Sequence, residues 1–232
     1  MQGSLLDMPT SLRTFWQKRW QVHVSIVYSM KAVPLFHWTG AGELSLGANM
    51  QIKFPVAETQ ALAVDYLLNG RPLDMVREAR IETLYAQEVR LRGWFTKTEL
   101  VETCRWKNPR LAKRVEINDD VFIQEVTRTA LSTTDERLRI EVLTLLKGVS
   151  WSMASVLLHF CHHEPYPILD ALELWSLGMG GSRSYHFDTW LEYTHACREA
   201  AQQAGVSMRM LDRALTRYAI LNKRLRKSAD AA

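Results

Sequence analysis

The sequence predicts an all-α protein made of successive short helices. From Ala57 onward, apolar residues recur at helical spacing, and Gly, Pro, Ser and Asn residues separate the periodic segments. We find no segment that alternates apolar and polar residues as a half-buried strand does, and no repeat of about 20–50 residues. These observations predict one helical domain over residues 51–232, preceded by a different kind of segment over 1–50.

Helix start and stop signals divide the first half of the predicted domain. The first helix has its apolar residues on one face, at Ala57, Ala61, Val64 and Leu68. The next begins with Pro72 near its first position and stops at Gly93. The stretch "TKTE" at 96–99 has capping-box spacing and opens a third helix, and "NPRLAKRV" at 108–115 places Asn108 at an N-cap before proline.

The second half is divided in the same way. We expect Asn118 to cap the first of these helices. The apolar faces carry Phe122, Val126 and Ala130; Leu138, Val142, Leu145 and Leu146; Ala154, Leu157, Leu158 and Cys161; and Phe187, Trp190, Thr194, Cys197, Ala201 and Ala204. The second helix is expected to end at Leu146, and the third to begin near Trp151. Gly205 ends the fourth helix, and Ser207 can cap a last one.

Composition favours an ordinary soluble domain. The chain has 232 residues, of which 47% are hydrophobic and 23% charged, and its net charge of +4 is compatible with nucleic-acid binding. Its three cysteines lie far apart without CxxC spacing, which excludes a disulfide framework and an iron–sulfur cluster and favours a reducing compartment. No apolar run reaches the roughly 18 residues of a membrane span, and no signal-peptide pattern is present. We therefore expect a cytoplasmic protein.

Residues 1–50 have no sustained helical period and few helix-start signals. We expect either a poorly ordered arm or an upstream extension, with Met50 as an alternative start. No functional residue is predicted in this segment.

The stretch "LLKGVSWSMASVLLHF" at 145–160 joins two predicted helices through a glycine turn. Gly148 permits a backbone conformation that other residues resist. Such a turn exposes amide N–H groups at a helix N-terminus, where the helix dipole favours an anion such as a DNA phosphate. A plain connection between two helices also commonly contains a glycine, so that interpretation stays open.

Asp170 closes the apolar loop "YPILD" directly before another predicted helix, "ALELWSLG". Asp170 and Glu173 have capping-box spacing, so a purely structural role as a helix cap is one interpretation of this carboxylate. A catalytic role is the other.

Read as one block, these segments resemble the signature of the helix-hairpin-helix base-excision DNA glycosylase superfamily, of the endonuclease III-like kind. In that family a Leu-Pro-Gly-Val-Gly hairpin precedes an Ala-containing helix, and a short loop then delivers a catalytic aspartate. The corresponding residues are Leu146, Gly148, Val149, Ala154 and Asp170. The resemblance covers about residues 135–178 and extends as a plausible helix order over 94–226.

The resemblance implies a glycosylase that flips a damaged or modified base out of duplex DNA and hydrolyses its N-glycosidic bond. Asp170 would stabilise the positive charge that builds on the sugar and activate a water. The backbone contacts would come from Lys147, Gly148, Val149, Ser150 and Ser152.

Two departures from the family's pattern matter. Ser150 replaces the hairpin's second glycine, which leaves that backbone less free to adopt positive φ. Ser152 stands where lyase-competent members carry a Schiff-base lysine, so the resemblance implies a monofunctional enzyme that uses water as its nucleophile.

Other residues are candidates for contacts with DNA. In "CRWKNPRLAKR" at 104–114, basic residues alternate with an aromatic one, which suits contact with phosphates and a base; a solvated helix face explains the same pattern. The candidates for phosphate contact are Arg105, Lys107 and Arg110, and those for a base pocket are Trp106, His159 and Trp175. Arg209, Arg213 and Arg217 recur every four residues, and further basic residues follow at 223, 224, 226 and 227. Together they can line one side of a DNA-binding surface, whereas singly they are ordinary surface charges.

The sequence gives little support for a metal site. His159 and His163 lie four residues apart, but Cys161 belongs to an apolar stripe and no second ligand pair has zinc spacing. We expect no cofactor, a monomer, and double-stranded DNA as the partner.

Two alternatives stay open: a non-catalytic DNA-binding protein that keeps the scaffold, and a helical interaction protein without a nucleic-acid role. A role in repair and a role in defence against foreign modified DNA fit the sequence equally, and the excised base is not identified by it.

Overall fold

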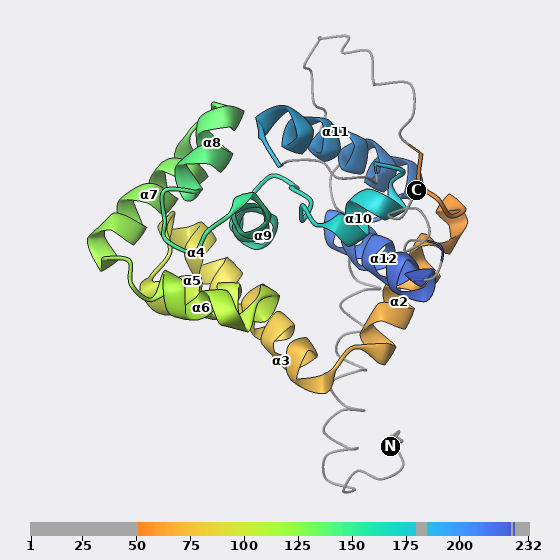
Figure 1. Ribbon diagram of the computed structural model, residues 1–232, viewed down its shortest axis with the longest axis horizontal. Helices are drawn as coiled ribbons and strands as arrows, with labels where there is room; N and C mark the ends of the chain where they lie inside the picture. Colours follow the sequence, from red (N-terminus) through yellow and green to blue (C-terminus); the bar gives the residue numbers. More distant parts are fainter. Residues whose placement is uncertain (1–50, 180–184, 224, 226–232) are drawn as a thin grey trace, which may run out of the picture. The chain divides into compact units, whose positions relative to one another are not determined.

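The structure is a computed structural model that describes residues 51–179, 185–223 and 225 (Figure 1). Over these residues the chain forms helices and connections, with no strand, which confirms the all-α class. The chain divides into two compact units, Met1–Leu44 and Ser45–Ala232, and every described residue belongs to the second. The arm predicted over 1–50 lies outside the described residues. Among the described helices none is long and apolar enough to cross a bilayer.

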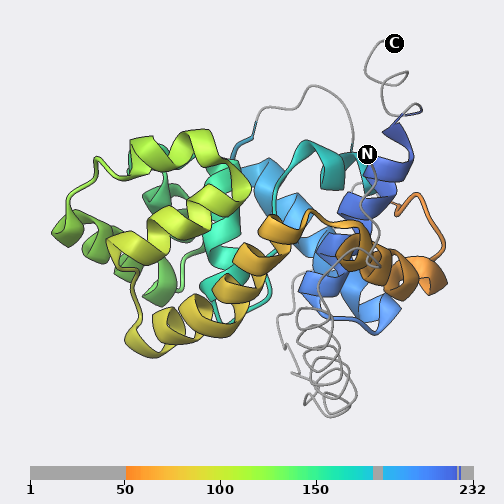
Figure 2. The same ribbon diagram turned by 90° about the horizontal axis from the view of Figure 1, so that it is seen from below.

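The helices follow one another with short connections. In chain order they are the 3-10 turn η2 (Val56–Glu58), α2 (Thr59–Asn69), α3 (Pro72–Arg80), the π-helical turn η3 (Ile81–Tyr85), α4 (Ala86–Arg92), α5 (Lys97–Lys107), α6 (Pro109–Val115), α7 (Asp120–Ser132), α8 (Glu136–Leu143), α9 (Trp151–Cys161), α10 (Ala171–Ser176), α11 (Phe187–Ala204) and α12 (Met208–Leu221). Helix α9 lies between two groups, α4–α8 on one side and α10–α12 on the other (Figures 1 and 2).

Helix α9 is buried on nearly all sides, which explains why its sequence is apolar almost throughout. Its buried residues are Met153, Ala154, Ser155, Val156, Leu157, Leu158, Phe160 and Cys161. It packs against α4, α5 and α8. Because its position is fixed by neighbours on several sides, α9 is a rigid support for whatever its two ends carry.

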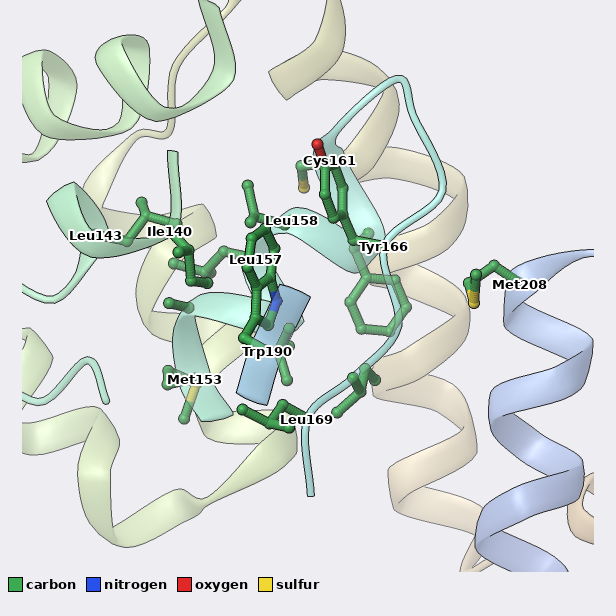
Figure 3. Packing of buried hydrophobic residues seen from close by; sticks show 14 of the residues in the cluster. Ile140, Leu143, Met153, Leu157, Leu158, Cys161, Tyr166, Leu169, Trp190 and Met208 are labelled. Atoms are coloured by element: carbon green, nitrogen blue, oxygen red, sulfur yellow. The ribbon is translucent and has the colours of Figure 1, made fainter. Parts of the chain in front are cut away.

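The loop between α9 and α10 is held by aromatic residues in the same core (Figure 3). The ring of Tyr166 stacks on that of Trp190 from α11, with 5.6 Å between centroids and 14° between planes. The hydroxyl of Tyr193, also in α11, donates to the carbonyl of Ile168 at 3.0 Å. This loop ends at Asp170, so the core fixes the backbone that delivers this carboxylate.

The local helix signals are mostly confirmed. Thr96 and Glu99 form a full capping box at the start of α5. The Asn108 side chain accepts from the amide of Arg110 at 3.0 Å and caps α6. Gly93 and Gly205 end α4 and α11 with φ of +82° and +61°, the left-handed conformation that glycine adopts readily.

Two predicted boundaries are wrong. Helix α8 ends at Leu143 and not at Leu146, because the chain enters the turn before the hairpin three residues earlier. Asn118 does not cap α7; the side chain of Asp119 accepts from the amides of Val121 and Phe122 instead. Asn118 is used elsewhere, as described below.

The predicted buried face of α2 is also wrong. The residues assigned to it, Ala57, Ala61, Val64 and Leu68, are all exposed. Helix α2 packs on α12 through a different side, where Ala63 is buried and Asp65 accepts from Nε of Arg217 at 2.5 Å. Because part of the packing face of α2 is polar, the apolar period identified the wrong side of this helix.

Candidate active site

The predicted hairpin is a tight turn before α9 that requires glycine at position 148. Gly148 has a φ of +85°. A Cβ added there would lie 3.0 Å from Cβ of Arg114, 3.0 Å from Cγ2 of Val115 and 3.1 Å from the amide nitrogen of Val115. The amide of Val149 donates to the carbonyl of Leu146 at 3.0 Å and closes the turn. Both backbone conformation and close packing on α6 therefore exclude a larger residue at Gly148.

Asn118 holds this turn from the side. Its Oδ1 accepts from the amide of Lys147 at 2.8 Å, and its Nδ2 donates to the carbonyl of Lys147 at 3.0 Å and to that of Val115 at 2.8 Å. The buried side-chain amide thus links the hairpin to the end of α6. Sequence reasoning missed this role; the signal was that two possible caps, Asn118 and Asp119, stand side by side and α7 needs only one.

Ser150 replaces the second hairpin glycine without backbone strain. Its φ of −92° and ψ of 175° are extended values that any residue adopts. Its hydroxyl accepts from the amide of Met153 at 3.4 Å and caps α9. A serine at this position therefore keeps the turn and adds a cap.

Several amides of this turn are free to bind a ligand. Within the described part of the chain, no acceptor meets the amides of Gly148, Ser150, Trp151 or Ser152. They stand at the N-terminus of α9, where the helix dipole favours an anion.

Basic side chains lie on the turn and on the helix packed against it. Exposed Lys147 lies in the hairpin, and α6, against which Gly148 packs, carries exposed Arg110, Lys113 and Arg114. We call these four residues the hairpin surface. Over the described ranges none of the four is paired with a carboxylate. Their charge is therefore available to a ligand from outside.

The Asp170 loop is tied to the same helix. Oγ of Ser155, on the second turn of α9, accepts from the amide of Leu169 at 2.8 Å and donates to the carbonyl of Ser152 at 2.8 Å. Asp170 follows immediately, at the N-cap position of α10, with its side chain one-third exposed. The hairpin and the aspartate are therefore both attached to the first two turns of α9.

The capping box that was one interpretation of Asp170 and Glu173 does not form. The Asp170 side chain makes no capping hydrogen bond, and the Glu173 carboxylate accepts from Oγ1 of Thr216 on α12. The Asp170 carboxylate is bonded instead to Nζ of Lys107, at the end of α5.

Lys107 thus lies against the aspartate and not on a free surface, where the sequence placed it as a phosphate contact. Its side chain is 19% exposed. Burial alone would lower the pKa of Lys107, but the charges of Glu173 and Asp170 outweigh burial and raise it. The ammonium is therefore the form that the site holds.

Two buried carboxyl groups lie behind this ion pair. Burial raises the pKa of Glu173 to about 8 and that of Asp212, on α12, to about 6. In the part of the chain that the structure describes, Oε2 of Glu173 and Oδ1 of Asp212 have no hydrogen-bond partner. We call Lys107, Asp170, Glu173 and Asp212 the carboxyl cluster.

The arginine stripe of α12 faces inward, so its assignment to a DNA-binding surface is wrong. The side chains of Arg209, Arg213 and Arg217 are only 15%, 16% and 16% exposed. Their partners are acidic: Arg209 Nε donates to Glu82 at 2.8 Å, Arg213 Nη2 to Glu78 at 2.6 Å, and Arg217 Nε to Asp65 at 2.5 Å. The stripe joins α12 to α2, α3 and η3.

The candidate base-pocket residues lie in two places. Half-buried Trp106 packs edge-on against Phe160, with 5.2 Å between centroids, and 5.4 Å separates its ring from the guanidinium of Arg209. Nδ1 of His159 donates to the carbonyl of Tyr166 at 2.6 Å, and burial lowers the pKa of His159 to about 3, which keeps the ring neutral.

Trp175 is buried elsewhere. Its ring lies under the ammonium of Lys53 at 3.8 Å and stacks on Tyr218 at 5.8 Å. Trp106 and His159 are close to Arg209, and Arg209 donates to Asp212 of the carboxyl cluster.

The basic candidates on α5 and α6 also differ. Arg105 pairs with Glu102 and, at 3.0 Å, with Glu116, so its charge is satisfied within the protein. Arg110 is part of the hairpin surface. Among the described residues, no three His, Cys, Asp or Glu side chains are grouped as a metal site would require, and Cys161 is buried.

The chain matches no protein-family model, and no curated protein and no solved structure shows significant similarity to it. The all-helical class stands on the structure itself, whereas membership in the helix-hairpin-helix glycosylase superfamily stays a prediction. The function of the site is therefore inferred from its own residues and geometry.

Proposed function

We propose that this protein is a DNA glycosylase that hydrolyses the N-glycosidic bond of a base flipped out of duplex DNA. The observation that carries the proposal is the hydrogen bond from the amide of Leu169 to Oγ of Ser155, at 2.8 Å. It ties the Asp170 loop to the helix whose N-terminus follows the hairpin. A rigid helix that supports both a phosphate anchor and a carboxylate suits an enzyme that pins a DNA strand and acts on one of its sugars.

Binding would begin at the hairpin. The unpartnered amides of Gly148, Ser150, Trp151 and Ser152 can donate to phosphate oxygens, and the hairpin surface supplies four positive charges from the hairpin and α6. Such contacts do not read sequence, so they hold any duplex and leave the choice of base to the pocket. Because they release counterions, affinity is expected to fall steeply as salt rises.

The chemistry would belong to Asp170. Cleavage of the N-glycosidic bond builds positive charge on the deoxyribose, and a nearby carboxylate stabilises that charge. The same carboxylate can orient and deprotonate the attacking water, after which the base leaves and an abasic site remains. Lyase-competent members of the superfamily that the sequence resembles carry a lysine at the position of Ser152. Because serine has no amine, we expect hydrolysis without strand cleavage.

The base would be received beside the carboxyl cluster. Flipping is necessary because the glycosidic carbon cannot be reached inside the stack. Half-buried Trp106 offers an aromatic face for stacking. Nε2 of neutral His159 is buried and has no hydrogen-bond partner among the described residues, so a base would have to enter the core beside Phe160 to donate to it.

The test is to incubate the protein with duplexes that each carry one altered base, and then cleave abasic sites with alkali. We expect strand breaks on at least one duplex after alkali and none before it. Asp170→Asn should abolish them, whereas the matched control Asp188→Asn, at an exposed aspartate of α11, should not. No product on any duplex, or equal product from Asp170→Asn, would count against the proposal.

A non-catalytic DNA-binding protein is the second candidate. The observation that favours it is the ion pair with Lys107, which occupies a carboxylate that is only 33% exposed. This candidate predicts salt-dependent duplex binding that survives Asp170→Ala, with no abasic product from the unaltered protein.

A further inference from the structure

Lys107 stands where the backbone leaves it little freedom. It is the last residue of α5, and the amide of the next residue, Asn108, donates to the carbonyl of Cys104 at 2.9 Å. Asn108 has a φ of −151° and at once caps α6. The chain is thus fixed on both sides of Lys107, and a cation at a helix C-terminus is favoured by the helix dipole.

The surroundings of its ammonium are acidic. Nζ of Lys107 is bonded to Asp170, and the buried carboxyl groups of Glu173 and Asp212 are close enough to act on its charge. A phosphate would have to displace the ammonium from this cluster, and the side chain is only 19% exposed. These facts disfavour the phosphate contact that the sequence suggested for Lys107.

The position of Asp170 shows what the pair achieves. An aspartate at an N-cap normally accepts from the amides of the first helical turn. Asp170 has the extended backbone of an N-cap, with φ of −143° and ψ of 159°, and an acidic residue at the capping-box position, Glu173. Its carboxylate is nonetheless on Lys107. Without the ammonium, the carboxylate would be free to turn back onto α10.

We propose that Lys107 positions Asp170 for base excision: its ammonium holds the carboxylate away from the amides of α10. The inference rests on the proposed function. Lys107 is a positioning residue, since it acts through Asp170 and not on the substrate.

The test separates this role from a phosphate contact. For Lys107→Met we expect the single-turnover excision rate to fall about 10–100-fold, because the carboxylate is misplaced. DNA affinity and its salt dependence should stay unchanged. Lys107→Arg, which can still form the ion pair, should recover part of the rate. Weaker binding with a salt slope reduced by about 0.9, and an unchanged rate on saturating DNA, would overturn the inference.

A second measurement does not depend on excision. The free energy of unfolding in urea would be measured for Lys107→Met, Asp170→Asn and the double variant. We expect the effects of the two substitutions on this free energy to be non-additive. Additivity would overturn the inference even if the protein excises bases. Non-additivity without excision on any duplex would instead show that the ion pair is real and that the proposed function has failed.

Lys107→Met leaves buried carboxyl groups without their cation and could prevent folding. In that case Lys107→Met/Glu173→Gln, which carries one fewer buried carboxyl group, replaces it in both measurements, with Glu173→Gln as its reference. The outcomes given above for Lys107→Met then support or overturn the inference in the same way.

Discussion

The hairpin and the Asp170 loop are attached to the same two turns of α9, yet the charged groups of the hairpin and of the carboxyl cluster are paired in opposite ways. Around the hairpin, four amides, those of residues 148 and 150–152, and the four basic side chains have no partner among the described residues. In the carboxyl cluster, Lys107 and Asp170 neutralise each other, and burial raises the pKa values of Glu173 and Asp212. The charged groups of the hairpin surface are therefore available to bind a large ligand, whereas those of the carboxyl cluster are paired with one another within the protein.

This difference predicts that binding and chemistry can be separated by mutation. The largest expected effect is that of Asp170→Asn, which keeps the shape of the side chain and removes its charge. Excision should fall by about a hundredfold to a thousandfold or more, with duplex affinity unchanged. Single-turnover kinetics and a binding titration measure the two. Equal loss of rate and affinity would mean that the hairpin and the carboxyl cluster do not have separate roles in binding and chemistry.

Gly148→Ala should weaken DNA binding, in contrast to Asp170→Asn, which should lower the excision rate. The left-handed φ and the contacts with α6 together should cost about 1–3 kcal/mol of unfolding free energy, and the displaced amides should weaken DNA binding. Gly93→Ala is the matched control, since Gly93 has a similar φ of +82° and no atom within 4 Å of an added Cβ. Urea unfolding and DNA titration should show a smaller stability loss for Gly93→Ala and no loss of affinity.

Neutralising the hairpin surface should produce a smaller change. Arg110→Gln and Lys113→Gln should each reduce the slope of log affinity against log salt by about 0.9, if each residue meets one phosphate. The excision rate on saturating DNA should not change. Arg128→Gln, which removes an equal charge from a residue paired with Glu125, should leave the slope as it was.

The smallest effect concerns the pH dependence of stability. The pKa of Glu173 is raised to about 8 from an ordinary value of 4.5, so the folded protein binds a proton that the unfolded chain has lost. The contribution of this proton to the free energy of unfolding is complete below pH 4.5 and is lost as the pH rises toward about 8.

Urea unfolding between these pH values should show that Glu173→Gln flattens this decline. Glu164→Gln, at an exposed residue, is the control. An identical decline in Glu173→Gln would contradict the assignment of a proton to this side chain.

The sequence predicted what depends on near neighbours along the chain. The capping box of Thr96 and Glu99, the Asn108 cap and the glycine ends of helices need only local geometry. The need for glycine at position 148 and the start of α9 near Trp151 were predicted in the same way.

Features that depend on distant partners were not predictable. Lys107 and Asp170 are 63 residues apart, and nothing near either one indicates the pair. Arg213 was placed on the surface because its partner Glu78 lies 135 residues earlier. Arginines four residues apart look the same in sequence whether they face solvent or buried carboxylates, so only the packing of α12 decides.

The most direct test of the central claim, that one helix holds both the phosphate anchor and the catalytic carboxylate, is a nuclear magnetic resonance titration. Asp170→Asn protein would be titrated with a duplex that carries a stable abasic-site analogue, and backbone amide signals would be followed. We predict that the signals of residues 148–152 and of residues 169–170 shift together, at the same DNA concentration. A shift at the hairpin with none at 169–170, or no shift at either, would contradict the account.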